Sequence, residues 1–339
     1  MVFTRTLMIK VHNKIEKLSL LFLNLISINF FVSYQNQFEI NALTRCCAVY
    51  GHPVSHSASP AMHNAAFRHL KLNWVYLAFD VLPHKLKNAI SGAQEMKFIG
   101  LNLTVPHKIF AFEIVDVMDN SAKNWGAVNT IRFEGKDVAG NWRPLSQFES
   151  EMPTELRSNG FNTDADAITS ALYEEFKYTP DNTTVLILGA GGAGRVAALK
   201  LASCGIKQLY IINRTLSKAV ELSDEIRKKY PDVSVKLDYP SGNVDLVINA
   251  TSLGLTNSDP MPVDLTKFRL NKTSCVYDMI YRPSETLFLK TARESGCKTA
   301  NGLSMLLWQG VKALEIWTQK PAPIEIMREA LIKNIYGNI

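Results

Sequence analysis

A glycine-rich turn between a short apolar run and a helical pattern constrains the fold of this chain more than any other feature. Residues 184–188 read T-V-L-I-L, which predicts a buried strand, and G-A-G-G-A-G follows at once over residues 189–194. In such a motif the first glycine makes the tight turn, the second lets the backbone approach a pyrophosphate, and the third lets helix and strand pack closely. The helix N-terminus then offers free N–H groups to phosphate. The turn therefore predicts a dinucleotide site.

The end of the next predicted strand, residues 209–212, indicates which dinucleotide is preferred. Chains that bind NAD place Asp or Glu there to hold the ribose 2′-hydroxyl, whereas this chain has Asn213, Arg214 and Thr215, with Lys218 one turn into the next helix. The planar guanidinium of Arg214 suits a 2′-phosphate, and Lys218 adds a second positive charge. The sequence therefore favours NADP over NAD, although Thr215 also suits a helix N-cap.

Strands and helices alternate along both halves of the chain after residue 44, which is typical of an α/β protein. In the first half the predicted strands are 46–50, 74–79 and 98–105, with helices from Ser59 (as N-cap), 83–94 and from Pro106, and a hairpin of 130–133 with 137–139. In the second half the further strands are 233–237, 246–249 and 274–279, with helices 195–203, 216–230, 283–295 and 303–318.

These patterns predict two α/β domains, and the family resemblance given below implies the cleft between them, the roles of the two domains and the return of the last helices. An N-terminal substrate domain covers 45–163 and a Rossmann-like NADP-binding domain covers 164–301. Residues 302–339 form C-terminal helices, the first of which returns to the substrate domain. The length of 339 residues suits two domains.

Composition excludes several classes of protein. Hydrophobic residues make up 47% and charged residues 20%, a balance that excludes wholesale disorder. The net charge of +6 is spread without a charge block, so we expect no nucleic-acid tail. The 5 cysteines include no C-x-x-C pair, which excludes a zinc ribbon and a disulfide scaffold and suits reduced thiols in the cytoplasm.

Residues 1–44 form an atypical N-terminal extension. Basic residues precede an apolar run over 18–32, as in a signal or targeting segment, but no small-x-small cleavage site follows and the run is short for a membrane span. A targeting segment and an extension foreign to the fold both stay open, and the segment is excluded from the fold argument.

Polar side chains gather at predicted strand ends and helix starts of the first half. They include Ser57, Ser59, Thr104, Lys108 and Asn129, and Asp164 opens the helix that leads into the second half. Ligands collect at the carboxyl ends of strands in open α/β sheets, so these groups suit a small polyhydroxy acid. Each has a local alternative, since hydroxyls and Asp164 also cap helices and lysines are usually solvated.

An ordered set of motifs carries a family resemblance from about residue 46 to 317. The chain reads Y-G-H-P-V-S-H-S-A-S-P-A-M-H-N at 50–64, N-L-T-V-P-H-K at 102–108, G-A-V-N-T at 126–130, N-T-D at 162–164, I-N-A-T-S-L-G at 248–254, Y-D-M-I-Y at 277–281 and N-G-L-S-M-L-L-W-Q at 301–309. Together with the glycine turn, these motifs resemble the shikimate/quinate dehydrogenase family. The resemblance implies an NADP-dependent oxidoreductase that reversibly reduces 3-dehydroshikimate to shikimate, a step of the shikimate pathway to chorismate and the aromatic amino acids.

The resemblance also implies a role for each matching position. Lys108 and Asp164 resemble the catalytic pair. The implied substrate-binding residues are Ser57, Ser59, Thr104, Asn129, Tyr281 and Gln309. The implied cofactor-binding residues are Gly189, Ala190, Gly191, Gly192, Ala193, Asn213, Arg214, Thr215, Lys218, Thr251, Met279 and Gly302. No metal, membrane or nucleic-acid partner is implied, and the expected form is a monomer or homodimer that binds a small-molecule substrate.

The implied reduction needs a hydride from NADPH and a proton for the ketone oxygen. A positioned ammonium at Lys108 can polarise that oxygen and donate the proton, with Asp164 orienting it. A nearby carboxylate favours the charged ammonium whereas burial favours the neutral amine, and the sequence leaves that balance open.

Residues 141–160 depart from the family pattern, because the family passes almost directly from the hairpin to N-T-D. With two prolines and little apolar periodicity, the segment predicts an inserted surface loop beside Asp164. Two other functions stay open at this point: an NAD-using quinate/shikimate dehydrogenase, and a non-catalytic homologue that binds nucleotide.

Overall fold

The computed structural model describes residues 39–149, 152–256 and 258–337. Contacts divide the chain into residues 1–44 and residues 45–339, and the fold below concerns the second of these units. The predicted N-terminal extension lies almost entirely outside the described residues.

A mixed sheet occupies the first half of this unit. Its strand order is β2-β1-β3-β5-β7-β4, with β6 paired to β5. The strands are β1 (Arg45–Gly51), β2 (Trp74–Asp80), β3 (Gly100–Leu103), β4 (Val117–Met118), β5 (Thr130–Lys136), β6 (Trp142–Pro144) and β7 (Leu156–Phe161). The first three run parallel, and β5 runs antiparallel to both β3 and β7.

The predicted loop over 141–160 is wrong in its second part. Residues 156–161 form β7, which pairs with β5 on one side and with β4 on the other, so the segment is integral to the sheet. The predicted hairpin is also displaced. Residues 130–136 form one continuous strand, the turn lies at 137–141, and β6 is the returning strand. Antiparallel β7 lacks strong apolar alternation because Arg157 and Asn159 bind the buried carboxylate of Glu134 instead.

The second sheet is parallel throughout, in the order β10-β9-β8-β11-β12-β13. Its strands are β8 (Thr184–Leu188), β9 (Gln208–Ile212), β10 (Ser234–Lys236), β11 (Val244–Asn249), β12 (Thr273–Asp278) and β13 (Lys298–Ala300). Side chains of β8 alternate between two cores. Val185 and Ile187 face one core, and Leu186 and Leu188 face the other, so both faces of the sheet are covered, as a doubly wound α/β fold requires.

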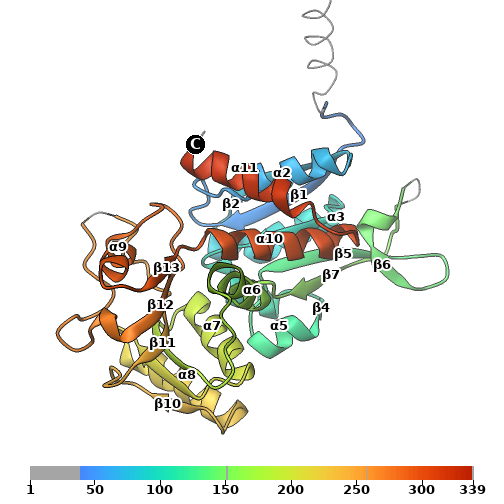
Figure 1. Cartoon of the computed structure of the whole chain (residues 1–339). Coiled ribbons are helices and arrows are strands. Elements are labelled where there is room, and N and C mark those ends of the chain that lie inside the picture. The colour runs from blue at the N-terminus through green and yellow to red at the C-terminus, as the bar shows by residue number, and fades with distance from the viewer. Residues whose placement is uncertain (1–38, 150–151, 257, 338–339) are drawn as a thin grey trace, which may run out of the picture. The chain divides into compact units, whose positions relative to one another are not determined.

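Helices cover both sheets (Figure 1). They are α2 (Ser59–His69), α3 (Leu86–Glu95), α4 (His107–Phe110), α5 (Asn120–Trp125), α6 (Asp164–Phe176), α7 (Gly192–Ser203), α8 (Leu216–Lys229), α9 (Leu287–Glu294), α10 (Leu303–Thr318) and α11 (Ile324–Tyr336). The predicted helix over 303–318 is confirmed as α10. Helix α2 begins at Ser59 with Ala58 as N-cap, one residue earlier than predicted, and α9 is shorter than predicted.

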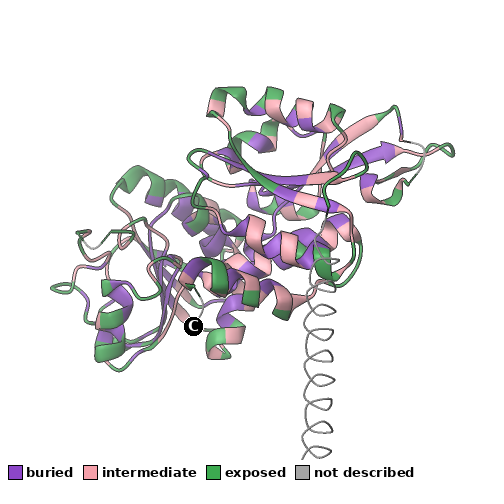
Figure 2. Cartoon of the chain, turned by 90° about the horizontal axis from the view of Figure 1, so that it is seen from above, coloured by how far each residue is buried: buried purple, intermediate pink, exposed green. Residues whose placement is uncertain are grey.

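Helix α10 crosses between the two halves. It contributes Leu307, Val311 and Trp317 to the core of the first sheet, and it lies beside α6 in Figure 1, where α11 lies beside α2. Figure 2 shows the strands largely buried and the outer helix faces exposed. Trp317 is fully buried, and its indole Nε1 donates to the carbonyl of Ile131 at 2.9 Å. The end of α10 is therefore fixed to the centre of the first sheet.

Gly100 of β3 should be intolerant of any side chain. A Cβ there would lie 2.1 Å from Trp317 Nε1 and 2.5 Å from the Ile131 carbonyl oxygen. We expect Gly100→Ala to lower the free energy of unfolding by about 1–3 kcal/mol or more, as over-packing does. Denaturant titration measures this change in the free energy of unfolding.

Gly92→Ala is the matched control in a helix, because a Cβ at Gly92 meets nothing within 4 Å. It should be neutral or stabilise by up to about 1 kcal/mol. Equal effects of the two substitutions would contradict the packing account.

Candidate active site

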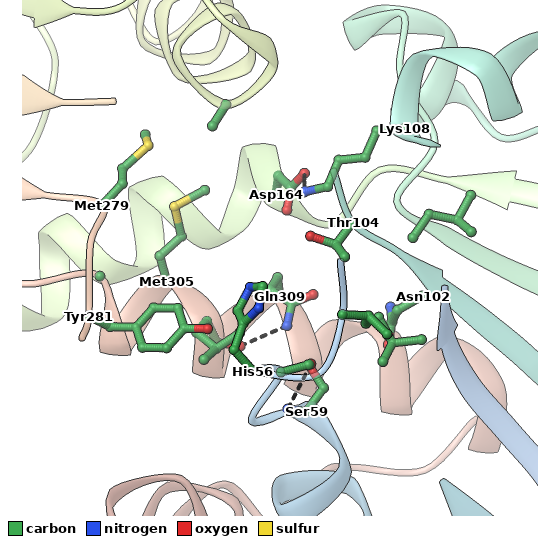
Figure 3. A pocket seen from close by; sticks show the side chains of 17 residues that line it. His56, Ser59, Asn102, Thr104, Lys108, Asp164, Met279, Tyr281, Met305 and Gln309 are labelled. Carbon is green, nitrogen blue, oxygen red and sulfur yellow. Dashed lines mark hydrogen bonds and ion pairs between the residues drawn. The ribbon is translucent and has the colours of Figure 1, made fainter. Parts of the chain in front are cut away.

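A cavity of about 210 Å³ lies where the carboxyl ends of strands from both sheets face α10. Figure 3 shows the side chains that line it. Among the predicted site residues, its lining includes Ser57, Ser59, Thr104, Lys108, Asp164, Ala193, Met279, Tyr281, Gly302 and Gln309. Residues far apart in the sequence thus meet in one cavity, as ligand sites of open α/β folds do.

An ion pair between Lys108 and Asp164 forms one wall of the cavity. Lys108 Nζ lies 2.7 Å from Asp164 Oδ2, and the Asp164 side chain is 8% exposed while that of Lys108 is 28% exposed. Figure 3 shows the two side chains approaching each other from different elements, Lys108 from α4 and Asp164 from the start of α6. A charge-assisted hydrogen bond of this length fixes the ammonium at the edge of the cavity.

Asn129 binds the carboxylate oxygen of Asp164 that does not contact Lys108. Its Nδ2 donates to Asp164 Oδ1 at 2.8 Å, and its Oδ1 accepts from the backbone N–H of Thr163 at 2.8 Å. Asn129 is 1% exposed and does not line the cavity, so its predicted contact with substrate stays a prediction. Each carboxylate oxygen of Asp164 thereby accepts one hydrogen bond, Oδ1 from Asn129 and Oδ2 from Lys108.

The backbone around the pair is fixed by the sheet and by a helix start. Asn162 Oδ1 accepts from the N–H groups of Asp164 and Ala165, which satisfies donors that a helix N-terminus leaves free. On the other side, the N–H of Val128 donates to the carbonyl of Lys108 at 2.9 Å. The N-T-D motif therefore sets α6, and the G-A-V-N-T segment touches both members of the pair.

Hydroxyl and amide groups line the rest of the cavity. Ser57 lies in the turn before α2, where its Oγ accepts from the N–H of Ser59 at 3.4 Å. Tyr281 follows β12, and its hydroxyl points into the cavity in Figure 3. Burial raises the pKa of Tyr281, so its phenol stays a hydrogen-bond donor. Gln309 lies on α10 and binds the carbonyl of Leu306, a helical turn earlier. These groups suit a ligand with a carboxylate and several hydroxyls.

The structure adds lining residues that the sequence argument did not assign. His56, Met305 and Leu306 border the cavity, as do Val49, Val54, Asn102 and Leu103. His56 immediately precedes Ser57 in the motif at 50–64. Met305 and Leu306 of α10 lie inside the motif at 301–309. Their position in these two motifs could have indicated that they lie near the site. Met305 also precedes Gln309 by four residues on the same helix, which places both on one helix face.

The glycine turn has the geometry that its sequence predicts. Gly189 has φ +106, which favours glycine, and a Cβ on Gly194 would lie 2.0 Å from the Gly189 carbonyl oxygen. A Cβ on Gly191 or Gly192 would meet nothing within 4 Å, so the space above the turn is open. Asn213 Oδ1 accepts from the N–H of Ala190 at 2.9 Å and so ties the turn to the end of β9.

The residues at the end of β9 fit a nucleotide with a 2′-phosphate. Arg214 and Lys218 are exposed, and neither forms a salt bridge within the described part of the chain. Thr215 occupies the N-cap of α8 without a capping hydrogen bond from its side chain, so its hydroxyl is available. Because no carboxylate stands at this position, the charge here is positive.

Family profiles and relatives agree with this geometry. A profile described as shikimate dehydrogenase substrate binding domain matches residues 49–131. One described as shikimate / quinate 5-dehydrogenase matches 172–256, and a shikimate 5'-dehydrogenase C-terminal domain matches 302–332. The chain is 38% identical over 307 residues to a shikimate dehydrogenase (NADP(+)) of Methanopyrus kandleri, with 88% of this chain and 98% of the relative covered. The chain belongs to the shikimate dehydrogenase family.

Solved shikimate dehydrogenases share the fold. A shikimate dehydrogenase crystallised with NADP+ matches with a TM-score of 0.74 and 38% identity over 88% of this chain and 98% of its own. The Thermus thermophilus enzyme in complex with NADP(H) and shikimate matches with a TM-score of 0.70 and 32% identity, over 86% and 99%. The α/β fold predicted from the sequence is confirmed, as is the family.

Thr251, which the sequence of this shikimate dehydrogenase family member predicts to lie on the cofactor side, belongs to a polar network around the buried residues Asn249 and Asp278. Asn249 Nδ2 donates to Asp278 Oδ1 at 3.0 Å, and Asn249 Oδ1 accepts from both the N–H and the hydroxyl of Thr251. Asp278 also accepts from the N–H of Ile280 at 3.0 Å and from the Thr286 hydroxyl at 2.7 Å. The network therefore holds the two loops that carry Thr251 and Met279. Thr251 itself is not among the residues lining the cavity.

Close approach of backbone shapes the same end of the cavity. A Cβ on Gly302 would lie 2.1 Å from the Met279 carbonyl oxygen, so the start of α10 packs directly on the loop after β12.

Among the described residues, no helix is both long and apolar enough to cross a membrane.

Asp278 should make stability depend on pH in an unusual direction. Burial, the largest cause, raises the pKa of Asp278 to about 6 against hydrogen bonds from Thr286, Ile280 and Asn249. The folded protein therefore holds this proton more tightly than the unfolded chain, and the contribution of Asp278 to stability is full below about pH 4 and falls as the pH rises through about 6.

Asp278→Asn removes this titration. We expect the free energy of unfolding of the variant, relative to wild type, to rise by roughly 3 kcal/mol between pH 4 and pH 7, since each pKa unit corresponds to about 1.4 kcal/mol. Denaturant titrations at several pH values measure it. Asp264→Asn is the control, because hydrogen bonds from Thr266 lower the pKa of that exposed carboxylate and the dependence on pH is reversed. A difference between Asp278→Asn and wild type that is constant with pH would refute the assignment.

Proposed function

We propose that this protein reversibly reduces 3-dehydroshikimate to shikimate with NADPH. The observation that carries the proposal is the Lys108–Asp164 ion pair at 2.7 Å in a cavity that also includes Ala193 of the glycine turn. A proton donor and the cofactor turn thus border one space. The similarity to NADP-dependent shikimate dehydrogenases over most of the chain supports the same reaction.

Substrate binding follows from the polar groups around the cavity. Ser57 and Ser59, at the start of α2, suit the carboxylate of shikimate because hydroxyls and a helix N-terminus both donate to anions. Thr104, Tyr281 and Gln309 suit its hydroxyl groups. Asp164 accepts hydrogen bonds only, so it also suits a substrate hydroxyl next to the reacting carbon.

Proton transfer is assigned to Lys108. NADPH, when bound, supplies the hydride that adds to the ketone carbon. The Lys108 ammonium donates a hydrogen bond to the ketone oxygen, which stabilises the negative charge that develops there, and then gives it the proton. Asp164, itself held by Asn129, directs the ammonium through its hydrogen bond. In the reverse direction the neutral amine of Lys108 takes the proton from the shikimate hydroxyl and becomes the ammonium.

Cofactor binding is assigned to the glycine turn and the end of β9. Residues 189–193 would hold the pyrophosphate, where a Cβ on Gly191 or Gly192 would meet no atom within 4 Å. Arg214 and Lys218 would hold the 2′-phosphate, and Asn213 and Thr215 would add hydrogen bonds. Thr251, Met279 and Gly302 would lie on the nicotinamide side. The cations Arg214 and Lys218, and the lack of an Asp or Glu at the end of β9, argue against NAD as the preferred cofactor.

Three finer expectations accompany the proposal. The limits of the substrate domain at 45–163 and of the NADP domain at 164–301 stay predictions, supported by separate cores around the two sheets. The cytoplasmic location and the monomeric or homodimeric state also stay predictions.

The proposal is tested with purified protein by following the absorbance of the NADPH or NADH formed from NADP+ or NAD+, with shikimate or quinate as the substrate. We expect shikimate with NADP+ to be the best pair. Arg214→Ala should raise the KM for NADP+ at least about tenfold, since a lost charge-assisted contact is worth about 1.5–3 kcal/mol, and leave the KM for NAD+ nearly unchanged.

Lys207→Ala is the control for loss of a positive charge in the same half of the chain, and should change neither KM. Equal changes in the KM of both cofactors for Arg214→Ala would remove Arg214 from phosphate recognition. A folded wild-type protein that turns over no pair would overturn the proposed function and favour a non-catalytic homologue.

A further inference from the structure

Arg195 belongs to the sequence around the glycine turn, and the proposed mechanism does not use it. It lies in the first turns of α7, two residues after Ala193, and its N–H donates to the Gly191 carbonyl at 2.8 Å. Its side chain is 29% exposed, so a charged group is held largely away from water in a defined position. Such a position requires specific partners.

Those partners lie on two other helices. Arg195 Nη2 lies 2.8 Å from both carboxylate oxygens of Glu225 on α8, and Nε donates to Glu225 Oε2 at 3.1 Å. Although burial alone would raise the pKa of Glu225, the hydrogen bond from Lys229 and the charges of Arg195 and Lys229 lower it, so Glu225 stays a carboxylate. The remaining nitrogen, Nη1, donates to the carbonyl of Trp125 at the end of α5.

This last contact reaches the segment that fixes the catalytic pair. Gly126 follows Trp125 with φ +61, and a Cβ there would lie 3.3 Å from Arg195 Nη2, so the guanidinium lies directly over this glycine. Val128, two residues later, donates to the carbonyl of Lys108. Asn129 comes next and holds Asp164.

The contacts therefore form an unbroken physical connection from the glycine turn to the catalytic pair. Its steps are the turn, Arg195, the carbonyl of Trp125, and the G-A-V-N-T segment over 126–130. Lys229 of α8 reinforces the connection, because its Nζ lies 2.8 Å from Glu225 Oε1 and 3.4 Å from the carbonyl of Asn124. Two cations thus meet the carbonyl end of α5, where a helix favours positive charge.

We propose that Arg195 is a positioning residue that couples occupation of the nucleotide turn to the placement of Lys108 and Asp164, so that NADP(H) and substrate strengthen each other's binding. A nucleotide that orders the turn fixes the start of α7 and hence the guanidinium. The guanidinium in turn fixes the segment that holds the pair. The coupling is a free energy shared by the two sites, so each ligand must raise the affinity of the other by the same factor.

The inference rests on the proposed function, and binding measurements separate the two. NADPH is the reduced cofactor and shikimate is the reduced substrate, so neither can accept a hydride from the other. The protein with both bound is therefore a ternary complex that does not turn over. Titration calorimetry gives the Kd of shikimate alone, the Kd of NADPH alone, and the Kd of shikimate at saturating NADPH. We expect NADPH to tighten shikimate binding to the wild type about fivefold or more, within the usual range of such couplings.

The coupling ratio is the Kd of shikimate alone divided by its Kd at saturating NADPH. Arg195→Met should bring this ratio to within about twofold of one, while the Kd of each ligand alone stays within about threefold of the wild-type value. Arg195→Lys keeps the charge but cannot hold Glu225 with two nitrogens, so it should give an intermediate ratio and carries the test if Arg195→Met fails to fold. Arg293→Met removes an exposed arginine paired with Glu285 on the opposite face of the second sheet and should keep the wild-type ratio.

Loss of stability alone would not change a ratio measured on folded protein. A wild-type ratio retained by both Arg195 variants would overturn the inference, and so would a wild-type ratio of one with both ligands bound. A wild-type protein that binds neither ligand would overturn the proposed function and the inference with it.

Discussion

Placing an ammonium and a carboxylate together at the edge of a cavity is costly unless every hydrogen bond of both is directed. In the Lys108–Asp164 pair, the surroundings hold the carboxylate and the backbone of both residues. Asn129 donates to the second carboxylate oxygen, Asn162 caps the helix that begins at Asp164, and Val128 binds the backbone of Lys108. Much of the first sheet can be understood as the support for this pair, because Asn129 itself lies between Leu103 of β3 and Phe161 of β7 through backbone hydrogen bonds.

The second sheet brings the cofactor side to the same place. Its glycine turn opens α7, and Ala193 reaches the cavity. The network of Asn249, Asp278 and Thr286 fixes the loops on the far side without any exposed charge. Helix α10 closes the cavity from below, since Trp317 anchors one end of it to the first sheet and Gly302 packs its other end on Met279. Positioning is thus divided between two sheets and one shared helix, which suits a reaction between two ligands.

The sequence predicted the local features well and the long-range ones less well. The glycine turn, the cations after β9 and the polar residues at strand ends follow rules of spacing and charge, so Gly189, Arg214 and Lys108 could be singled out from the sequence, and their roles stay predictions. Strand β7 was missed because its buried residues include serine and glycine, whose place in a strand is set only by pairing with β5 and β4. Tertiary context overrides intrinsic strand preference in such cases. The partners of Arg195 were also inaccessible, since Trp125 and Glu225 lie in distant segments.

The central claim is that Lys108 and Asp164 act as one unit, and a double-mutant cycle tests it most directly. The values of kcat/KM for shikimate oxidation are compared among wild type, Lys108→Met, Asp164→Asn and the double variant. If the pair acts as a unit, the double variant loses about as much as Lys108→Met alone, because groups that work together are strongly non-additive. Losses that multiply across the cycle, as for independent sites, would contradict the account.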